Sequence, residues 1–432
     1  MKYLNKSLLL LVFIGCWMAC KKEEPMVTPP EVEPEEVVIP TLYTEIMEVM
    51  KEWYLWNDEI PEVDLASYSS PSDLLNDLAW HPNDQWSYIG QASTVQSFYD
   101  EGEFIGHGYG WTWYEDGTLR LNFVYEDSPA YEAGMRRGFA VIEIDNKDIR
   151  NINIKTAVGP NTVGHQTTFT VINLEGDTTQ LTMAKEVVKM NTVLHTEVNE
   201  VAGKQVGYLV FKSFVTPSIA ELDQAFNEFK GQGVEELVLD LRYNAGGRVS
   251  VAKHLLSWLA PFSAEGQTMF EYSHNTDRAE EHNSLVVFDS ISHSLNLNKL
   301  VVLTSLGTAS ASELIINSLR PYIPVVTIGY DTYGKPVGSY GFTTSDEQYV
   351  IAPISLRIVN ANGEGDYFNG LTPDSYTVDN PKVPFGDDEE WGFQQAMYYI
   401  ENGSFGDFGK TFPLPLEPVV TFKGIDFEIG SF

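Results

Sequence analysis

The feature that most limits the fold is an alternation of apolar strand patterns and helical patterns that starts near Gly203. Short, continuous apolar runs are typical of strands buried on both faces, and such strands need helices on either side. The alternation therefore favours an α/β layer with largely parallel strands. The predicted strands are residues 206–211, 236–241, 300–304 and 325–328, and the predicted helices are residues 218–229, 249–259, 311–319 and 391–400.

Length and charge narrow the class of protein further. A chain of 432 residues suggests two or three domains, and 43% hydrophobic residues are enough to build their cores. The formal net charge is −34. A surface this acidic repels nucleic acid, so we expect no nucleic-acid partner and a polymeric substrate that is neutral or basic.

The first twenty residues have the pattern of an export signal. Lys2 and Lys6 precede an apolar run over residues 8–14, which is too short to span a bilayer. The only cysteines, Cys16 and Cys20, lie here, so the mature chain has no disulfide scaffold. Cys20 and the residues after it resemble a bacterial lipoprotein processing site, which predicts lipidation at Cys20 and a membrane anchor. Ordinary signal cleavage, giving a soluble secreted protein, is the alternative.

Two further segments precede the body of the protein. Residues 21–40 are rich in Pro, Glu and Val and predict an extended, flexible tether. Residues 41–102 predict a small helical domain, because Leu42, Ile46 and Met50 recur at helical spacing. Its many tryptophans and tyrosines favour core packing, and a sugar-binding platform is the alternative.

Residues 103–188 change to short strands separated by turn signals. A glycine-flanked loop at residues 104–110 is followed by Asp127-Ser128-Pro129-Ala130 and by an apolar strand at 141–145. This order resembles a PDZ domain. The resemblance implies that an extended peptide binds as an added strand, with its terminal carboxylate at the loop of Gly108, Tyr109 and Gly110. A generic small β domain is the alternative.

Ser310 is the candidate nucleophile. The predicted strand 300–304 leads through a turn of small residues to Ser310, which stands at the start of the helix 311–319. Free N–H groups at a helix amino terminus stabilise a developing oxyanion. The N–H of Ala311 is one expected donor, and the turn at Gly246-Gly247 is expected to supply another. Simple helix capping by Ser310 is the alternative, and Ser305 and Ser312 are competing nucleophiles by composition.

Lys335 is the candidate general base. It lies between Gly334 and Pro336, shortly after the strand 325–328. Burial there would lower the pKa of the lysine towards the working pH, which is what proton abstraction from a serine requires. An ordinary solvated surface lysine is the alternative.

Taken together, "TASASE" at 308–313, "YGK" at 333–335 and "DLRYNAGG" at 240–247 resemble the carboxyl-terminal processing serine peptidases of family S41. The resemblance covers residues 103–374. It implies Ser310 as nucleophile, Lys335 as base, and an oxyanion hole of Ala311 with Gly246 or Gly247. It also implies a crotonase-like β/α spiral protease core at 189–400, followed by an extension at 401–432. Ser339 occupies the position of a glutamine that orients the lysine in many members, so Ser339 is a possible lysine-orienting residue.

Other chemistries have little support. The sequence has no HExxH motif and no Cys/His zinc spacing, and no phosphate-binding glycine motif follows a strand, so we predict no metal and no cofactor. His254 could in principle pair with Ser310, but a packed helix histidine is favoured. We therefore predict an α/β multidomain, exported serine endopeptidase that acts on C-terminal tails of proteins. An inactive PDZ-type scaffold is the runner-up, and acyl-CoA chemistry on a crotonase-like core ranks last.

Overall fold

The computed structural model describes residues 39–81, 83–114 and 117–408. All of these described residues belong to one compact unit. The predicted signal peptide, Cys20 and nearly all of the predicted tether lie outside the described residues, as does most of the predicted C-terminal extension. Among the described residues, no helix has the length and apolar character needed to cross a membrane.

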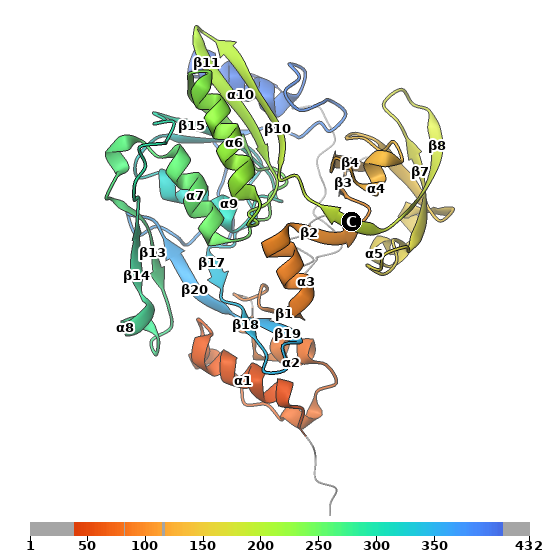
Figure 1. Ribbon diagram of the computed structural model, residues 1–432, viewed down its shortest axis with the longest axis vertical. Helices are drawn as coiled ribbons and strands as arrows, with labels where there is room; N and C mark the ends of the chain where they lie inside the picture. The colour runs from red at the N-terminus through yellow and green to blue at the C-terminus, as the bar shows by residue number, and fades with distance from the viewer. Residues whose placement is uncertain (1–38, 82, 115–116, 409–432) are drawn as a thin grey trace, which may run out of the picture. The chain divides into compact units, whose positions relative to one another are not determined.

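A six-stranded sheet forms the centre of the larger domain (Figure 1). Its strand order is β10–β11–β12–β15–β16–β21, and every neighbouring pair is parallel except β10–β11. The predicted parallel layer is thus confirmed, and the antiparallel edge strand β10 was not predicted. The strands are β10 (Val193–Val201), β11 (Lys204–Phe211), β12 (Val234–Asp240), β15 (Leu300–Thr304), β16 (Val325–Gly329) and β21 (Ser375–Tyr376).

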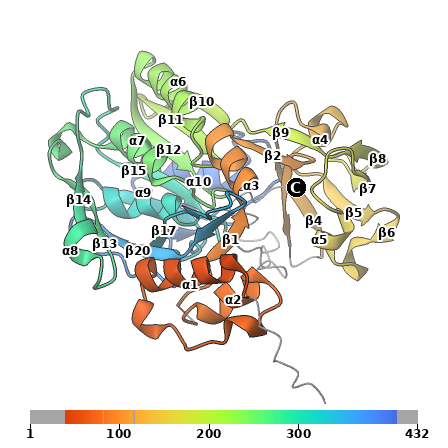
Figure 2. The ribbon, with the colours of Figure 1, turned by 60° about the horizontal axis from the view of Figure 1, so that its bottom comes forward.

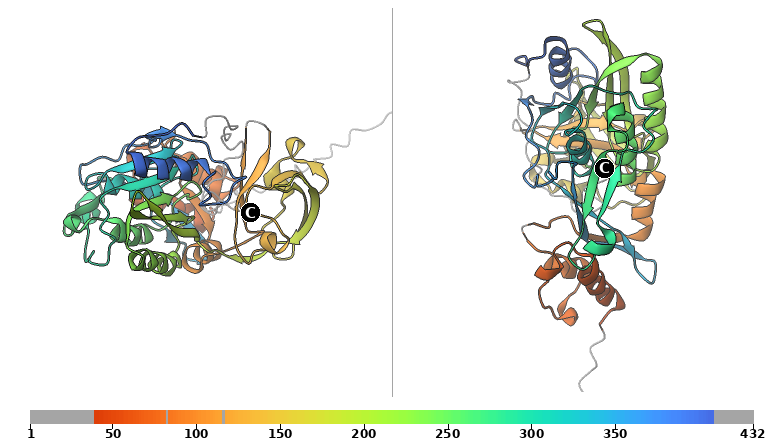
Figure 3. Two further views of the ribbon diagram at one scale, coloured as in Figure 1. Left: turned by 90° about the horizontal axis from the view of Figure 1, so that it is seen from above. Right: turned by 90° about the vertical axis from the view of Figure 1, so that its left-hand side faces the viewer.

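Helices cover both faces of this sheet, as its alternating side chains require. Leu209 and Phe211 of β11 face a core shared with three helices, whereas Tyr208 and Val210 face a core shared with a fourth. Figure 3 shows two of the three helices, drawn in green, on the side of the sheet opposite to the blue fourth helix. The three are α6 (Ser218–Gly231), α7 (Val249–Leu259) and α9 (Ala311–Leu319), and the fourth is α10 (Trp391–Asn402).

Two smaller sheets flank the central one, and the sequence did not predict either. One has the order β14–β13–β20–β17, and the other has the order β1–β19–β18. In the second, Tyr88–Gln91 near the amino terminus pairs with Tyr349–Ala352. The bounds are β1 (Tyr88–Gln91), β13 (Thr268–Ser273), β14 (Ser284–Val287), β17 (Val337–Ser339), β18 (Phe342–Thr343), β19 (Tyr349–Ala352) and β20 (Ile354–Val359).

The amino-terminal helices α1 (Thr41–Trp53) and α2 (Pro71–Leu78) pack beside these strands (Figure 2). Ile46, Met50 and Leu74 share one hydrophobic core with Val337 and Ile354. Tyr54 and Trp86 are also buried in it, which supports core packing for the aromatic residues. This segment and the sheet beside it therefore form one packing unit.

Residues 103–189, which we call the β domain, have a separate core around Tyr109, Leu121 and Phe169. The main sheet has the order β3–β4–β5–β7–β8, with β6 paired to β5, and β2 pairs with β9. Strand β3 therefore ends the sheet. The elements are β2 (Glu103–Gly106), β3 (Tyr109–Trp113), β4 (Leu119–Val124), α4 (Pro129–Glu132), β5 (Ala140–Ile144), β6 (Lys147–Asp148), α5 (Ile154–Ala157), β7 (Gln166–Ile172), β8 (Thr178–Ala184) and β9 (Glu186–Lys189).

Candidate active site

Ser310 stands between strand β15 and helix α9, as predicted. Its backbone has φ 55° and ψ −113°, a conformation that residues other than glycine seldom adopt. Such strain costs on the order of 1–3 kcal/mol and gathers at functional sites. The N–H of Ala311, the first residue of the helix, donates to no acceptor among the described residues. A free N–H therefore lies next to the strained serine.

The glycine turn after β12 lies directly against this serine. A Cβ atom placed on Gly246 would be 2.9 Å from the Ala311 nitrogen and 2.9 Å from Ser310 Cβ. Both glycines have positive φ, 103° at Gly246 and 137° at Gly247. The two backbones can approach this closely because neither glycine carries a side chain.

The Asn244 side chain binds the N–H of one of the two glycines, Gly246 and Gly247. Its Oδ1 accepts a hydrogen bond from the Gly246 N–H at 2.9 Å, so that donor is already engaged. The bridge to Phe214 uses the Gly246 carbonyl and the Arg248 N–H, and it leaves the Gly247 N–H without an acceptor among the described residues. Of the two glycines, Gly247 is thus the one whose N–H has no acceptor among the described residues, and its predicted role as an oxyanion donor stays a prediction.

Lys335 and Ser310 are joined through the carboxylate of Glu313. Glu313 Oε2 accepts from the Ser310 N–H at 2.8 Å and from the Lys335 N–H at 2.8 Å. Oε1 accepts from the Gly334 N–H at 2.7 Å and from the Thr332 hydroxyl at 2.5 Å. One buried carboxylate thus joins the loop of Ser310 to the loop of Lys335. Lys335 is itself buried, with 8% of its surface exposed.

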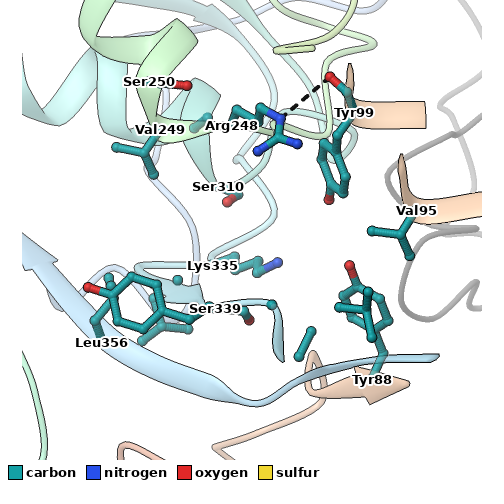
Figure 4. A pocket seen from close by; sticks show the side chains of 18 of the residues that line it. Tyr88, Val95, Tyr99, Arg248, Val249, Ser250, Ser310, Lys335, Ser339 and Leu356 are labelled. Carbon is teal, nitrogen blue, oxygen red and sulfur yellow. Dashed lines mark hydrogen bonds between the residues drawn. The ribbon is translucent and has the colours of Figure 1, made fainter. Parts of the chain in front are cut away.

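Ser310 and Lys335 line one cavity of about 970 Å³ (Figure 4). The opposite wall comes from the segment that follows the amino-terminal helices, through Tyr88, Val95 and Tyr99. Arg248, just past the glycine turn, reaches this wall. It donates from Nε to the Tyr99 carbonyl at 3.4 Å and forms an ion pair with Asp100. The cavity is therefore closed in by residues from distant parts of the sequence.

The competing candidates have structural partners. Ser312 Oγ donates to the Asn244 carbonyl at 2.9 Å, and Ser305 Oγ donates to the Arg242 carbonyl. His254 Nε2 lies 2.7 Å from Asp223 Oδ1, and His254 does not line the cavity. Ser339 does line it, but Ser339 Oγ is buried with no hydrogen-bond partner among the described residues. Its predicted role as a lysine-orienting group stays a prediction.

In the β domain, Gly108 is the only one of the three predicted peptide-binding loop residues that lies outside a strand. Gly108 has φ 90°, and a Cβ there would meet Ser128 Cβ at 2.2 Å. Tyr109 and Gly110 already belong to strand β3, where they pair with Val124 and Phe123 of β4, and the Tyr109 side chain is buried in the domain core. No cluster of three or more His, Cys, Asp or Glu side chains suited to a metal occurs in the part of the chain that the structure describes.

Sequence reasoning missed three features of the site. These are the Glu313 clamp, the Asn244 acceptor and the wall from residues 88–100. Glu313 was detectable, since Ser-x-x-Glu before an apolar helix is the capping-box pattern. The other two depend on contacts between distant segments.

A strained serine at a helix start, a buried lysine in the same cavity and two N–H donors nearby are the features of a serine-hydrolase site. Comparison with known families identifies the chain. Residues 205–377 match Peptidase family S41, and residues 42–88 match the Peptidase S41 N-terminal domain. Together these matches cover about half of the chain, and the chain belongs to peptidase family S41.

The chain is also similar to two proteins named as carboxyl-terminal-processing proteases. The chain is 28% identical over 225 residues to a carboxyl-terminal-processing protease of Picosynechococcus, a match that covers 51% of each chain. It is 27% identical to a carboxy-terminal-processing protease of Bartonella bacilliformis, with 70% of each chain covered. The chain thus spans about half the length of the first of these relatives.

Solved structures confirm the predicted fold class. A crystal structure from Bacteroides fragilis described as a "Putative S41 protease" superimposes with a TM-score of 0.69 at 24% identity, covering 87% of this chain and all of that one. The photosystem II D1 C-terminal processing protease superimposes with a TM-score of 0.53 at 20% identity, covering 82% and 95%. The α/β multidomain S41 protease fold is therefore established for this chain.

Proposed function

We propose that this chain is a serine endopeptidase in which Ser310 is the nucleophile and Lys335 the general base. The observation that carries the proposal is the Glu313 carboxylate, which binds the backbones of both residues beside one cavity. Family membership supports peptide hydrolysis as the reaction.

The reaction follows from the positions of these groups. Ser310 Oγ attacks the peptide carbonyl carbon while Lys335 Nζ takes the hydroxyl proton. The Ala311 and Gly247 N–H groups donate to the oxyanion of the tetrahedral intermediate, and each such donor is typically worth about 3 kcal/mol of barrier. Collapse breaks the C–N bond, and Lys335 gives its proton to the leaving amine. Water then attacks the acyl-enzyme carbonyl while Lys335 takes its proton. The C–O bond to Ser310 breaks, the carboxylic acid product leaves, and Lys335 returns the proton to Ser310 Oγ.

The β domain supplies a site for the substrate's tail under this proposal. Strand β3 lies at the end of its sheet and directly follows the Gly108 turn. A peptide can add to such an edge as a further strand, with its terminal carboxylate at the turn. We infer that the substrates are unfolded proteins or proteins with flexible C-terminal tails.

We also propose that the protein is exported and lipid-anchored at Cys20, so that its substrates are exported proteins of the cell envelope. The amino-terminal pattern of Lys2, Lys6 and the apolar run supports this. Metabolic labelling with a fatty-acid analogue tests it. We expect a labelled band that disappears in Cys20→Ala, and equal labelling of both forms would contradict lipidation at Cys20.

Fluorophosphonate labelling of the purified mature protein tests the catalytic assignment. We expect covalent labelling and hydrolysis of an unfolded protein, with both lost in Ser310→Ala and hydrolysis lost in Lys335→Ala. Ser257→Ala is the matched control, since Ser257 Oγ binds the Lys253 carbonyl on α7 away from the cavity. A parent protein that binds tail peptides at the β domain but is neither labelled nor hydrolytic would favour the scaffold alternative.

A further inference from the structure

We propose that Tyr340 determines which side chain the cavity accepts next to the scissile bond, and that His274 is the positioning residue that holds Tyr340 in place. The inference rests on the proposed function, because it concerns the substrate of that same site. The substrate residue concerned is the one whose carbonyl Ser310 attacks, and its side chain would be bulky and apolar.

The part of the cavity that extends from Ser310 along α9 is apolar. Leu314 lies one helical turn after Ser310 and lines the cavity with Leu356 and Ile358. All three are buried side chains of the main core. Tyr272 and Tyr340 also line the cavity. Walls of aliphatic and aromatic side chains favour the binding of an apolar substrate side chain, because binding removes apolar surface from water.

The orientation of His274 follows from Asn283. The Asn283 side chain faces the backbone N–H of His274 at 2.8 Å, and because an N–H can only donate, the facing atom is the oxygen Oδ1. The same Oδ1 lies 3.2 Å from His274 Nδ1, so Nδ1 carries the ring proton. Nε2 then has a free lone pair, and it accepts a hydrogen bond from the Tyr340 hydroxyl at 3.0 Å.

The surroundings of His274 favour its neutral form, which this hydrogen bond requires. His274 is 7% exposed, and its burial lowers its pKa. The nearby His282 acts in the same direction, while the Asn283 hydrogen bond acts against it. A protonated ring would have no lone pair for Tyr340.

Two ring contacts and a backbone hydrogen bond also hold Tyr340 in place. The His274 ring stacks against it at 5.7 Å between centroids, and the Trp53 ring meets it edge-on at 5.6 Å. The Tyr340 N–H donates to Ser355 Oγ at 3.3 Å. Since Trp53 belongs to α1, the amino-terminal helices help to fix one wall of the substrate cavity.

Quenched peptides with a free C-terminus, identical except for Ala, Leu or Phe at the attacked residue, test this inference. In the parent protein we expect Leu to exceed Ala in kcat/KM by at least about tenfold, the scale of one or more buried methylenes. Tyr340→Ala enlarges the site, so we expect the Phe-to-Leu ratio to rise about tenfold. A Phe-to-Leu ratio unchanged in Tyr340→Ala would overturn the specificity assignment.

A double-mutant cycle tests the role of His274. We expect His274→Leu to lower the Leu-to-Ala ratio about three- to tenfold in the parent, and to have little further effect in Tyr340→Phe, where the hydroxyl is gone. Loss of kcat/KM by one common factor for all peptides, or independent effects in the double variant, would show that His274 is merely structural. Thermal unfolding checks that each variant is folded. If Ser310 in the parent protein is not labelled by fluorophosphonate, the proposed function fails and this inference fails with it.

Discussion

Glu313 joins the two residues of the proposed catalytic pair through its carboxylate. Its carboxylate is almost fully buried, and burial raises its pKa, while the hydrogen bonds from Thr332, Lys335, Gly334 and Ser310 oppose that shift. Every one of these four partners donates to it. A side chain that presents a donor here would repel at least one of them.

Glu313→Gln is therefore expected to disturb the site although it conserves shape. The amide NH₂ group must face at least one backbone N–H, because each oxygen of the Glu313 carboxylate accepts from a backbone N–H. We therefore expect a loss of stability of about 1–3 kcal/mol and a fall in kcat/KM of about 100-fold. Urea unfolding and peptide hydrolysis measure the two effects. Glu265→Gln, at an exposed position, serves as the control. Unchanged hydrolysis in Glu313→Gln would show that the clamp is dispensable.

His107 gives a prediction about pH. It is fully buried in the β domain, and burial, together with Lys185 and His165, lowers its pKa to about 3. The unfolded chain has an ordinary histidine pKa of about 6.5. Between these two values the unfolded state binds a proton that the folded state does not. The free energy of unfolding therefore rises with pH in this window, by up to about 1.4 kcal/mol per pH unit from this group.

His107→Phe should flatten that dependence. The ring already stacks with Tyr109 and meets Phe169 edge-on, so an aromatic replacement keeps its neighbours. Urea unfolding at pH 4.5 and pH 7 measures the difference, and His81→Phe at an exposed position is the control. The same difference in parent and His107→Phe would refute the assignment.

At the scale of elements, the turn after β12 depends on its glycines. A Cβ on Gly247 would lie 2.4 Å from the Phe214 carbonyl oxygen, and φ is 137°. Gly247→Ala must therefore shift the backbone that carries the expected oxyanion donor. We expect a drop in kcat/KM of at least about 100-fold with a stability loss of about 1–3 kcal/mol.

Gly231→Ala is the matched substitution, because a Cβ there meets nothing within 4 Å. Hydrolysis by this variant should equal that of the parent. If Gly247→Ala retains parental hydrolysis while folded, the Gly247 N–H is not an oxyanion donor.

The elements that could be predicted from sequence are those with strong local patterns. The helix at 311–319 and the strand at 300–304 have the predicted bounds, since continuous apolar runs and a helix-start serine are local signals. Strands β1, β18 and β19 were missed because they are short and partly exposed, and their pairing joins distant segments. Ser310, Lys335 and the glycine turn could be selected by motif. The contact of Tyr340 with His274 could not, because it exists only after folding.

At the scale of the molecule, a buried polar network joins the β domain to the core. Arg137 of the β domain donates to the Tyr243 hydroxyl at 2.7 Å and pairs with Asp379 at 3.1 Å. Asp379 also pairs with Arg242 at 3.0 Å, and Arg242 pairs with Glu390 at 2.8 Å. Tyr243 lies three residues before Gly246. The network thus connects the β domain with the start of the glycine turn.

Asp379→Asn should weaken this connection. It leaves two buried guanidinium groups with one fewer carboxylate, and breaking a buried ion pair typically costs about 3 kcal/mol or more. Urea unfolding measures the resulting loss of stability. Asp331→Asn, whose carboxylate accepts from Tyr376 at the surface, is the control, with an expected change within about 0.5 kcal/mol. Equal stabilities of the two variants would contradict the network's role.

The backbone of Ser310 has a consequence for the evolution and engineering of this chain. With φ at 55°, glycine would adopt this backbone conformation with less strain than serine or any other residue that has a nucleophilic side chain. Selection for thermal stability alone would therefore favour replacing Ser310, the proposed nucleophile, whereas selection for turnover would retain it. For trapping bound substrates, Ser310→Ala preserves the native loop, whereas Ser310→Gly would relax the geometry that a trapped complex is meant to reveal.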